Sequence, residues 1–365
     1  MSARLSLPLP SEAETFFHAA ITGNWEAVSN HFPLVKEPGG YERAIPQLQN
    51  ELWAPIHETF GLWEMWIGWK EDSALLTMFG DSILSSMPKG SIYFGGTDCG
   101  RFVITAMNAT REPPTVFCIT QNALADNTYA AHLRATSGDN IWLPQVEDSA
   151  KAFQQFVDDW KTGKTPLGAD IKTENGRMQV TGVQAVMAFN GILCKMIFDH
   201  NKDAHGFFVE ESYVLDWMYP YLEPCGLIMK LNPQSTNNLS ADIVARDRTF
   251  WNQYVGLLEG HPGFTNNVQA RKAFSKLRAG IAGLYAYRKM YGEAKAAFQQ
   301  AIRLCPASPE ASFRLAHMYE EQGRTAEALK VMADYLTHVP PDARDKAAAE
   351  YVERLKNASS TVEPK

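Results

Sequence analysis

The stretch Gly90-Ser-Ile-Tyr-Phe-Gly-Gly-Thr-Asp-Cys-Gly-Arg101 decides how the middle of this chain folds. Residues 91–94 predict a short buried strand, and residues 102–107 predict a helix. The glycines between them allow a turn whose backbone N–H groups point outward at the positive end of a helix dipole. Such a turn can hold an anion, but tight packing alone would also explain it.

Around this turn the sequence alternates between strand and helix patterns. The predicted elements are strands at residues 116–119, 207–209 and 226–231, an edge strand at 141–144, a hairpin around Asn175-Gly176, and helices at 122–133, 149–160 and from 183. A strand, a helix and a strand in this order form a right-handed crossover with parallel strands. We therefore predict an α/β fold with a mostly parallel sheet covered by helices on both faces.

In sheets of this kind, ligands bind beyond the carboxyl ends of the strands. Three predicted strand ends carry polar residues, which we take as candidate ligand-binding residues: Gly96, Thr97, Asp98, Arg101, Gln121, Asn122, Glu210, Glu211 and Asp216. If they converge, they form a mixed acidic and amide site with one arginine. Loops at this edge of a sheet are polar by default, so a purely structural role is the alternative. The glycine turn is not GxGxxG and has no Walker lysine, so a familiar nucleotide-binding motif is unsupported.

A helical repeat is the clearest functional signal in the sequence. Three pairs of residues recur at an interval of 34 positions: Tyr285 with Tyr319, Ala294 with Ala328, and Pro306 with Pro340. This interval is the period of tetratricopeptide repeats, in which each unit is a pair of packed helices. The sequence departs from the usual pattern at Arg278 and Ser312, where a bulky apolar residue is usual, and at Tyr335, where a small one is usual. Two repeats are too few for an independent array, so we expect this unit to lean on the α/β domain.

The first helix of each repeat is predicted to line a groove. Its candidate residues are Lys276, Ala279, Gly283 and Tyr287 from the first unit, and Phe313, His317 and Glu320 from the second. The functional interpretation is a groove for a peptide or protein partner. The alternative is a C-terminal layer that only stabilises the rest of the chain.

Composition and charge narrow the function classes. The net charge is −7 and the basic residues are scattered, so we predict no nucleic-acid partner. No run of about 18 apolar residues occurs, which predicts no membrane span. The five cysteines are far apart and never form a CxxC pair, and no HExxH occurs. We therefore predict no metal site and no cofactor. Dispersed cysteines and the lack of an export signal favour a cytoplasmic protein.

These patterns predict a division of the chain into five parts. The parts are an N-terminal helical region at residues 1–88, an α/β domain at 89–236, a connecting helix and loop at 237–269, a tetratricopeptide-like unit at 270–357, and a disordered tail at 358–365. The N-terminal region reads as helices because capping residues precede its apolar stripes.

Several segments together carry a resemblance to a known group of proteins: residues 92–102, 120–124, 209–220, 226–230 and the repeat. In these segments the chain resembles the soluble C-terminal half of bacterial membrane proteins related to protein O-mannosyltransferases. The resemblance implies an α/β domain followed by tetratricopeptide repeats, a membrane glycosyltransferase-like protein as a partner, and an envelope-associated location as the alternative to the cytoplasm. It transfers no glycosyltransferase activity, because in that family the membrane spans would hold the lipid-linked donor and the catalytic acid.

Two hypotheses for function follow from the sequence. The first is a non-catalytic binding or scaffold protein that uses the helical repeat to dock a protein partner. The second is a glycan-processing or glycosyl-transferring enzyme, in which Asp98, Glu210 and Glu211 would supply the acid and base groups. The absence of a recognisable sugar-donor motif favours the first.

Overall fold

The computed structural model describes residues 8–36, 49–111, 113–164, 170–174, 177–210, 215–236, 238–340 and 346–360. Helices predominate among them. The chain divides into two compact units. The first unit is Met1–Gly68 with Met87–Phe208, and the second is Trp69–Ser86 with Val209–Lys365. The predicted boundaries of the five sequence regions stay a prediction.

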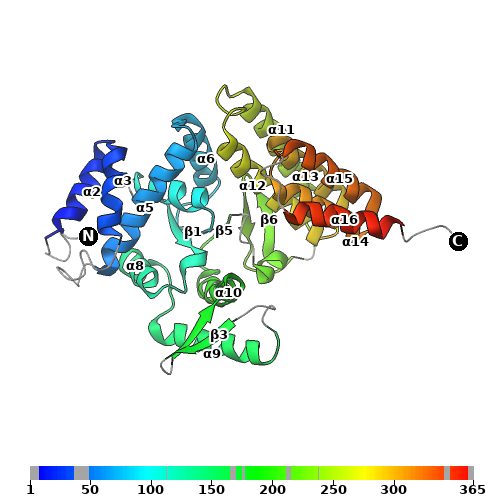
Figure 1. Ribbon diagram of the computed structural model, residues 1–365. Coiled ribbons are helices and arrows are strands. Elements are labelled where there is room, and N and C mark those ends of the chain that lie inside the picture. The colour runs from blue at the N-terminus through cyan, green and yellow to red at the C-terminus, as the bar shows by residue number, and fades with distance from the viewer. Residues whose placement is uncertain are drawn as a thin grey trace. The chain divides into compact units, whose positions relative to one another are not determined.

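The described strands form a mixed five-stranded sheet with the order β2-β1-β5-β7-β6, and a separate hairpin (Figure 1). The sheet strands are β1 (Ser91–Gly95), β2 (Val116–Thr120), β5 (Phe207–Val209), β6 (Leu222–Cys225) and β7 (Ile228–Leu231). β1 and β2 are parallel, with Gly95 opposite Thr120. β6 and β7 are antiparallel. The prediction of a mostly parallel sheet is therefore confirmed only for the first pair.

The antiparallel pair arises from a two-residue turn. Gly226 has a φ of +64°, a conformation that residues with a side chain rarely adopt, so the chain reverses there instead of entering a strand. Cys225 pairs with Ile228 across the turn. The predicted strand at 226–231 thus begins later than expected and acquires a partner. Pro224 lies in β6 at the edge of the sheet, where the missing N–H is tolerated.

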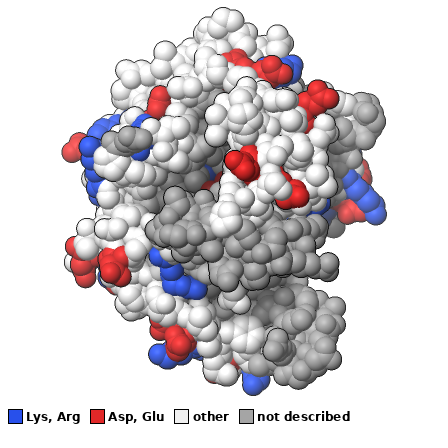
Figure 2. Space-filling view, turned by 90° about the vertical axis from the view of Figure 1, so that its left-hand side faces the viewer, with Lys and Arg blue, Asp and Glu red and all other residues white. Residues whose placement is uncertain are grey.

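The first unit begins with packed helices, as the sequence predicts. α2 (Ser11–Ile21), α3 (Trp25–Val35) and α5 (Gln49–Gly68) share a hydrophobic cluster that includes Phe16, Val28 and Ile56. After β1 the chain enters a five-residue π-helix, η2 (Cys99–Val103), and continues as α7 (Ile104–Ala109). The face of the molecule seen in Figure 2 shows basic and acidic atoms in small, interspersed groups.

The predicted helix at 122–133 is split in the structure. A short 3-10 turn, η3 (Gln121–Ala123), follows β2, and α8 (Asn127–Ser137) begins only after Asp126. The Asp126 side chain accepts hydrogen bonds from the backbone N–H groups of Thr128 and Tyr129. This cap satisfies N–H groups that have no partner inside the helix, and it fixes where the helix starts.

The predicted edge strand at 141–144 is wrong. The Asn201 side chain accepts a hydrogen bond from the Trp142 N–H at 2.8 Å and donates one to the Trp142 carbonyl at 2.9 Å. One side-chain amide thus satisfies the backbone groups that a neighbouring strand would otherwise satisfy. The first unit continues with α9 (Val146–Lys161), the hairpin β3 (Asp170–Glu174) and β4 (Arg177–Thr181), and α10 (Val183–Asn201), which confirms the predicted hairpin and helices.

The second unit contains α6 (Ser73–Ser85), the 3-10 helix η6 (Asp216–Tyr221) and a stack of helices near the C-terminus (Figure 1). The stack consists of α11 (Ala241–Gly260), α12 (Val268–Tyr287), α13 (Tyr291–Leu304), α14 (Pro309–Glu321), α15 (Thr325–His338) and α16 (Lys346–Ser360). Tyr285, Tyr319, Ala294 and Ala328 are all buried. The repeat positions therefore fill the space between helices, as their spacing predicts.

A single arginine forms hydrogen bonds between the helical stack and the segment of the same unit that contains η6 and β6. Arg288, directly after α12, donates hydrogen bonds to the carbonyl oxygens of Tyr219, Pro220, Leu222 and Thr236. Burial lowers the pKa of Arg288, but a guanidinium remains charged in proteins. These carbonyls come from two stretches of chain, so one side chain fixes both.

Gly61→Ala is expected to destabilise the first unit by about 1–2 kcal/mol, because overpacking a tight contact costs more than the helix propensity of alanine gains. A Cβ at Gly61 in α5 would lie 2.4 Å from the Phe102 ring. Urea unfolding followed by circular dichroism measures the change. Gly256→Ala in α11 is the control, since nothing lies within 4 Å of its added Cβ and stabilisation is expected there. Equal behaviour of the two variants would contradict the tight contact.

Candidate functional site

The first helices of the repeats form a hollow in the second unit, which we call the α14 groove. Its volume is about 360 Å³, and α12, α14 and α16 supply most of its lining. The residues that matter for its chemistry are Gly283, Phe313, Arg314, His317, Glu321 and Tyr351. Three of them, Gly283, Phe313 and His317, are residues that the repeat period predicted for a partner groove.

The wall of the α14 groove is aromatic. The rings of Phe313 and Tyr351 are stacked, with centroids 5.6 Å apart and planes at 15°. Tyr335 meets Phe313 edge-on at 6.0 Å, so its large side chain supports the wall from behind. The Tyr351 hydroxyl donates a hydrogen bond to Glu320 at 2.9 Å, and Arg354 also binds that carboxylate. These hydrogen bonds hold α16 against α14, and those from Arg354 in particular lower the pKa of Glu320.

The floor of the α14 groove carries a cation. A Cβ on Gly283 would lie 1.9 Å from Nη2 of Arg314, so the guanidinium rests directly on the backbone of α12. Arg314 makes no hydrogen bond or ion pair with any residue that the structure describes. His317, in contrast, lies 3.4 Å from Glu321. The groove therefore offers one unpaired positive charge beside an aromatic wall.

The other predicted groove residues have partners elsewhere. Lys276 forms an ion pair with Glu310 at 3.2 Å, and Glu320 is held by α16. Tyr287 is about half exposed and stacks on Tyr219 at 4.8 Å. The sequence did not indicate Arg314 or Tyr351. Arg314 follows a predicted groove residue, but Tyr351 lies on a helix beyond the two repeats, where the period gives no guidance.

The predicted ligand residues after β1 and β2 come together in the first unit. Thr97 organises the glycine turn, because its hydroxyl accepts from the Gly100 N–H at 3.0 Å and its carbonyl from the Arg101 N–H at 2.8 Å. Asn122 donates to the Gly96 carbonyl at 3.3 Å and so joins the two strand ends. Gln121 is buried beside it. Burial raises the pKa of Glu64, and the charge of Asp98 on the same turn raises it further.

The remaining predicted ligand residues belong to the second unit or lie outside the described residues, so their convergence with the others stays a prediction. Glu210 is buried at the end of β5, and Asp216 is exposed at the start of η6; both are part of the second unit. Glu211 lies outside the described residues. No contact among the described residues joins Asp98 to Glu210, so nothing there supports the two as a joint acid and base.

Glu58 is a functional candidate that the sequence analysis missed. It lies on α5, partly buried, and acts electrostatically on Arg101 of the glycine turn. Burial raises the pKa of Glu58 to about 7, against a smaller opposing effect of the Arg101 charge. The only sequence signal is its spacing: Glu58 follows Ala54 by four residues and precedes Gly61 by three, which puts a carboxyl group on a buried helical stripe.

A second hollow, of about 380 Å³, lies between α11, α12 and α13. At its base, Asp247 accepts hydrogen bonds at 2.8 Å from both Arg278 and the Tyr285 hydroxyl. The Arg278 guanidinium lies 5.0 Å from the Trp251 ring centroid. All four side chains are buried. This network explains why an arginine replaces the usual apolar residue of the repeat, and its role is structural.

Two general features of the described part of the chain bear on function. No group of histidine, cysteine, aspartate and glutamate side chains there could hold a metal ion. None of the helices described is both long and apolar enough to cross a membrane.

Comparison with known protein families supports the interpretation of the C-terminal helices as a tetratricopeptide-like unit. Residues 286–349 match the family described as "Tetratricopeptide repeat". The match runs from the end of α12 into α16, and it supports a role in protein interaction. Searches of curated proteins and of solved structures found no match.

Proposed function

We propose that this chain is a non-catalytic binding protein that holds a segment of a protein partner in the α14 groove. The observation that carries the proposal is the stacked pair Phe313 and Tyr351 beside the unpaired Arg314. Aromatic side chains and arginines are the residues that most often dominate binding energy at protein interfaces. The match to the tetratricopeptide family supports the same conclusion.

The groove chemistry defines the segment that it accepts. An apolar or aromatic side chain would pack on the wall made by Phe313 and Tyr351. A carboxylate of the segment would pair with Arg314, whose guanidinium has no partner in the described chain. We therefore propose a segment that places an acidic residue close to a large apolar one. A membrane glycosyltransferase-like protein as the source of this segment rests only on the sequence resemblance.

A display library of random peptides, selected against the full chain, tests the proposal. Selected peptides are expected to be enriched in acidic and large apolar residues. Phe313→Ala and Arg314→Gln should each weaken their binding by about tenfold or more, measured by fluorescence anisotropy, because each removes an anchor of the segment. Leu257→Ala, which removes an exposed side chain from α11, is the control and should leave binding unchanged.

Tyr287→Ala decides how far the groove extends along α12. A loss of affinity would include the stacked Tyr287 and Tyr219 in the binding surface; unchanged affinity would confine binding to the α14 groove. The proposal is wrong if peptides are selected but bind equally well to Phe313→Ala and Arg314→Gln. Because Arg314 makes no hydrogen bond in the described chain, Arg314→Gln is expected to fold normally. A loss of peptide binding by this variant would therefore report on the groove and not on misfolding.

A further inference from the structure

We propose that the first unit binds a small oxyanion, a carboxylate or a phosphate group, on the free edge of Arg101. The proposal concerns Glu58, Arg101 and Asn122, which we call the strand-end cluster. It is independent of the α14 groove, because the groove belongs to the second unit.

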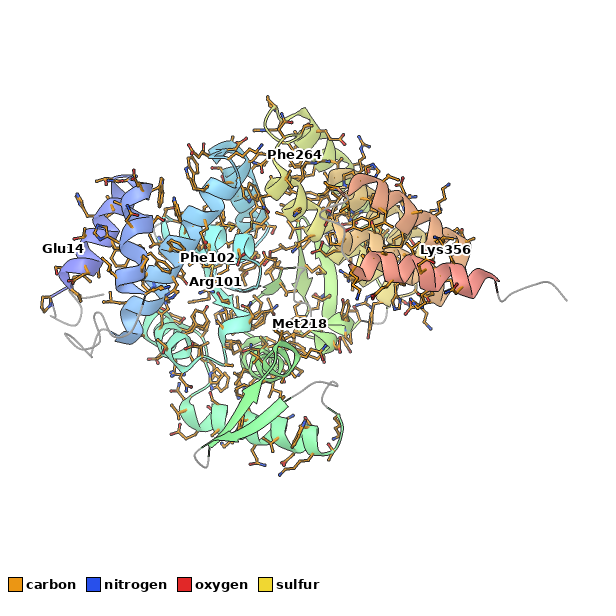
Figure 3. All side chains as sticks on the ribbon, in the orientation of Figure 1. Glu14, Arg101, Phe102, Met218, Phe264 and Lys356 are labelled. Carbon is orange, nitrogen blue, oxygen red and sulfur yellow. The ribbon has the colours of Figure 1, made fainter. Side chains whose placement is uncertain are left out.

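Arg101 has two buried donors without a partner. Its Nε and Nη2 atoms are inaccessible to solvent and make no hydrogen bond with any described residue. These two atoms form one edge of the guanidinium, and their N–H groups match the two oxygens of a carboxylate or phosphate. The guanidinium is held over the Phe102 ring at 4.7 Å from its centroid, and Figure 3 labels both residues after β1. A fixed edge of unpaired donors is costly unless a ligand satisfies it.

The neighbouring acid does not satisfy Arg101. Glu58 interacts electrostatically with Arg101, yet the two form no ion pair, and Glu58 makes no hydrogen bond with the described chain. These two opposite charges are both partly buried and make no direct hydrogen bond or ion pair, so neither side chain satisfies the other. A ligand that accepts from Arg101 and meets the Glu58 carboxyl would satisfy both side chains.

The position of the strand-end cluster suits a ligand. Arg101 and Asn122 follow the carboxyl ends of the parallel strands β1 and β2, the edge at which α/β sheets bind ligands. The Asn122 side chain donates a hydrogen bond from Nδ2 to the Gly96 carbonyl, but its buried Oδ1 has no hydrogen-bond partner. Arg101 also lies inside a π-helix, a distortion that often occurs at functional sites.

The protonation state of Glu58 should control how tightly the anion binds to Arg101. Ionised Glu58 repels an anion on Arg101, whereas protonated Glu58 can donate a hydrogen bond to it. Among the described residues, Glu58 interacts electrostatically with Arg101, with Cys118 of β2 and with Tyr129 of α8. Burial raises the pKa of Cys118 to about 12 and also raises that of Tyr129, so neither changes charge near neutral pH. Among these groups, Glu58 is the one with a pKa of about 7, so it is the one that changes charge near neutral pH.

The experiment uses the full chain labelled with ¹⁵N-arginine, so that each arginine Nε–H gives an NMR signal. The Arg101 signal is identified by its loss in Arg101→Lys. Sulfate, standing for phosphate, and acetate, standing for carboxylate, are titrated at constant ionic strength; both keep their charge between about pH 6 and pH 8. The Arg101 signal is expected to shift and saturate with at least one of them, which also identifies the preferred class of oxyanion. Binding should be about fivefold or more tighter at the lower pH, because Glu58 is then protonated.

Variants distinguish anion binding at the strand-end cluster from nonspecific anion binding elsewhere on the protein. Glu58→Gln mimics the protonated acid, so its affinity should match the wild-type value at low pH and should no longer depend on pH. Arg101→Lys keeps the charge but loses the two-donor edge, and thermal stabilisation by the chosen anion should fall by about tenfold in potency. Lys89→Gln, at an exposed position of the same unit, is the control. The proposal is overturned if the Arg101 signal fails to saturate with either anion, or if all arginine signals shift together.

Discussion

Asp247→Ala is expected to lower the free energy of unfolding by about 3–5 kcal/mol, the largest effect that we predict for a single substitution. Asp247 is the only described acid that neutralises Arg278, and it also accepts the Tyr285 hydroxyl. Its removal leaves a buried guanidinium without a counter-charge and a buried hydroxyl without an acceptor. Asp242→Ala is the control, because Asp242 is exposed in the first turn of the same helix and its loss should cost less than about 1 kcal/mol.

Two measurements test this expectation. Urea unfolding gives the free-energy change, and hydrogen exchange should show the loss of protection in α11 and α12 but not in α9 of the first unit. Replacing both partners, Asp247→Leu with Arg278→Met, should recover most of the stability, since it removes both buried charges together. A loss below about 1 kcal/mol for Asp247→Ala would show that the network does not hold the helices together.

Glu58→Gln is expected to stabilise the first unit at high pH, by about 2–3 kcal/mol. The pKa of Glu58 is about 7 in the folded chain, against an ordinary value of 4.5. Between these values the folded state binds more protons than the unfolded state, so stability falls as pH rises. The contribution is fully present below the ordinary value and is lost as pH rises through the folded pKa. Glutamine cannot ionise, so it removes this pH dependence.

Unfolding of the wild type and of Glu58→Gln, measured at about pH 5 and at about pH 8, checks whether the variant is the more stable protein at high pH. The variant and the wild type should differ little at the lower pH, and the variant should be the more stable at the higher one. Glu14→Gln removes the same charge from an exposed position of α2 in the same unit and serves as the control. A variant that is less stable than the wild type at high pH would mean that ionised Glu58 is stabilised by a group in the fold, and the raised pKa would be wrong.

The helical unit could be predicted because its signals are local. Tyr285 and Tyr319 recur at a fixed interval, and each fills the space between helices that follow one another in the chain. The network around Arg278 could not be predicted, because its partner Asp247 lies on α11, which is outside the repeat. The sequence showed Arg278 only as a departure from the pattern, and such a departure does not name the residue that compensates it.

The sheet and the strand-end cluster show a similar limit. The glycine turn and β1 were predictable from local sequence, whereas β6 is only four residues long, contains Pro224 and becomes a strand through its pairing with β7. Glu58 lies on a helix about forty residues before Arg101, and no spacing rule joins the two. The wrong prediction of an edge strand at 141–144 has the same cause, because the Trp142 backbone is hydrogen-bonded to the side chain of Asn201, which is distant in the sequence.

The hydrogen bonds of Arg288 have a consequence for any cleavage of the backbone. This side chain holds carbonyls of residues 219–222 and of Thr236 at the same time. A protease nick between residues 232 and 236 would therefore leave the new ends fastened to one guanidinium. The two fragments would stay associated until a denaturant released them, and the cut would be visible only on a denaturing gel.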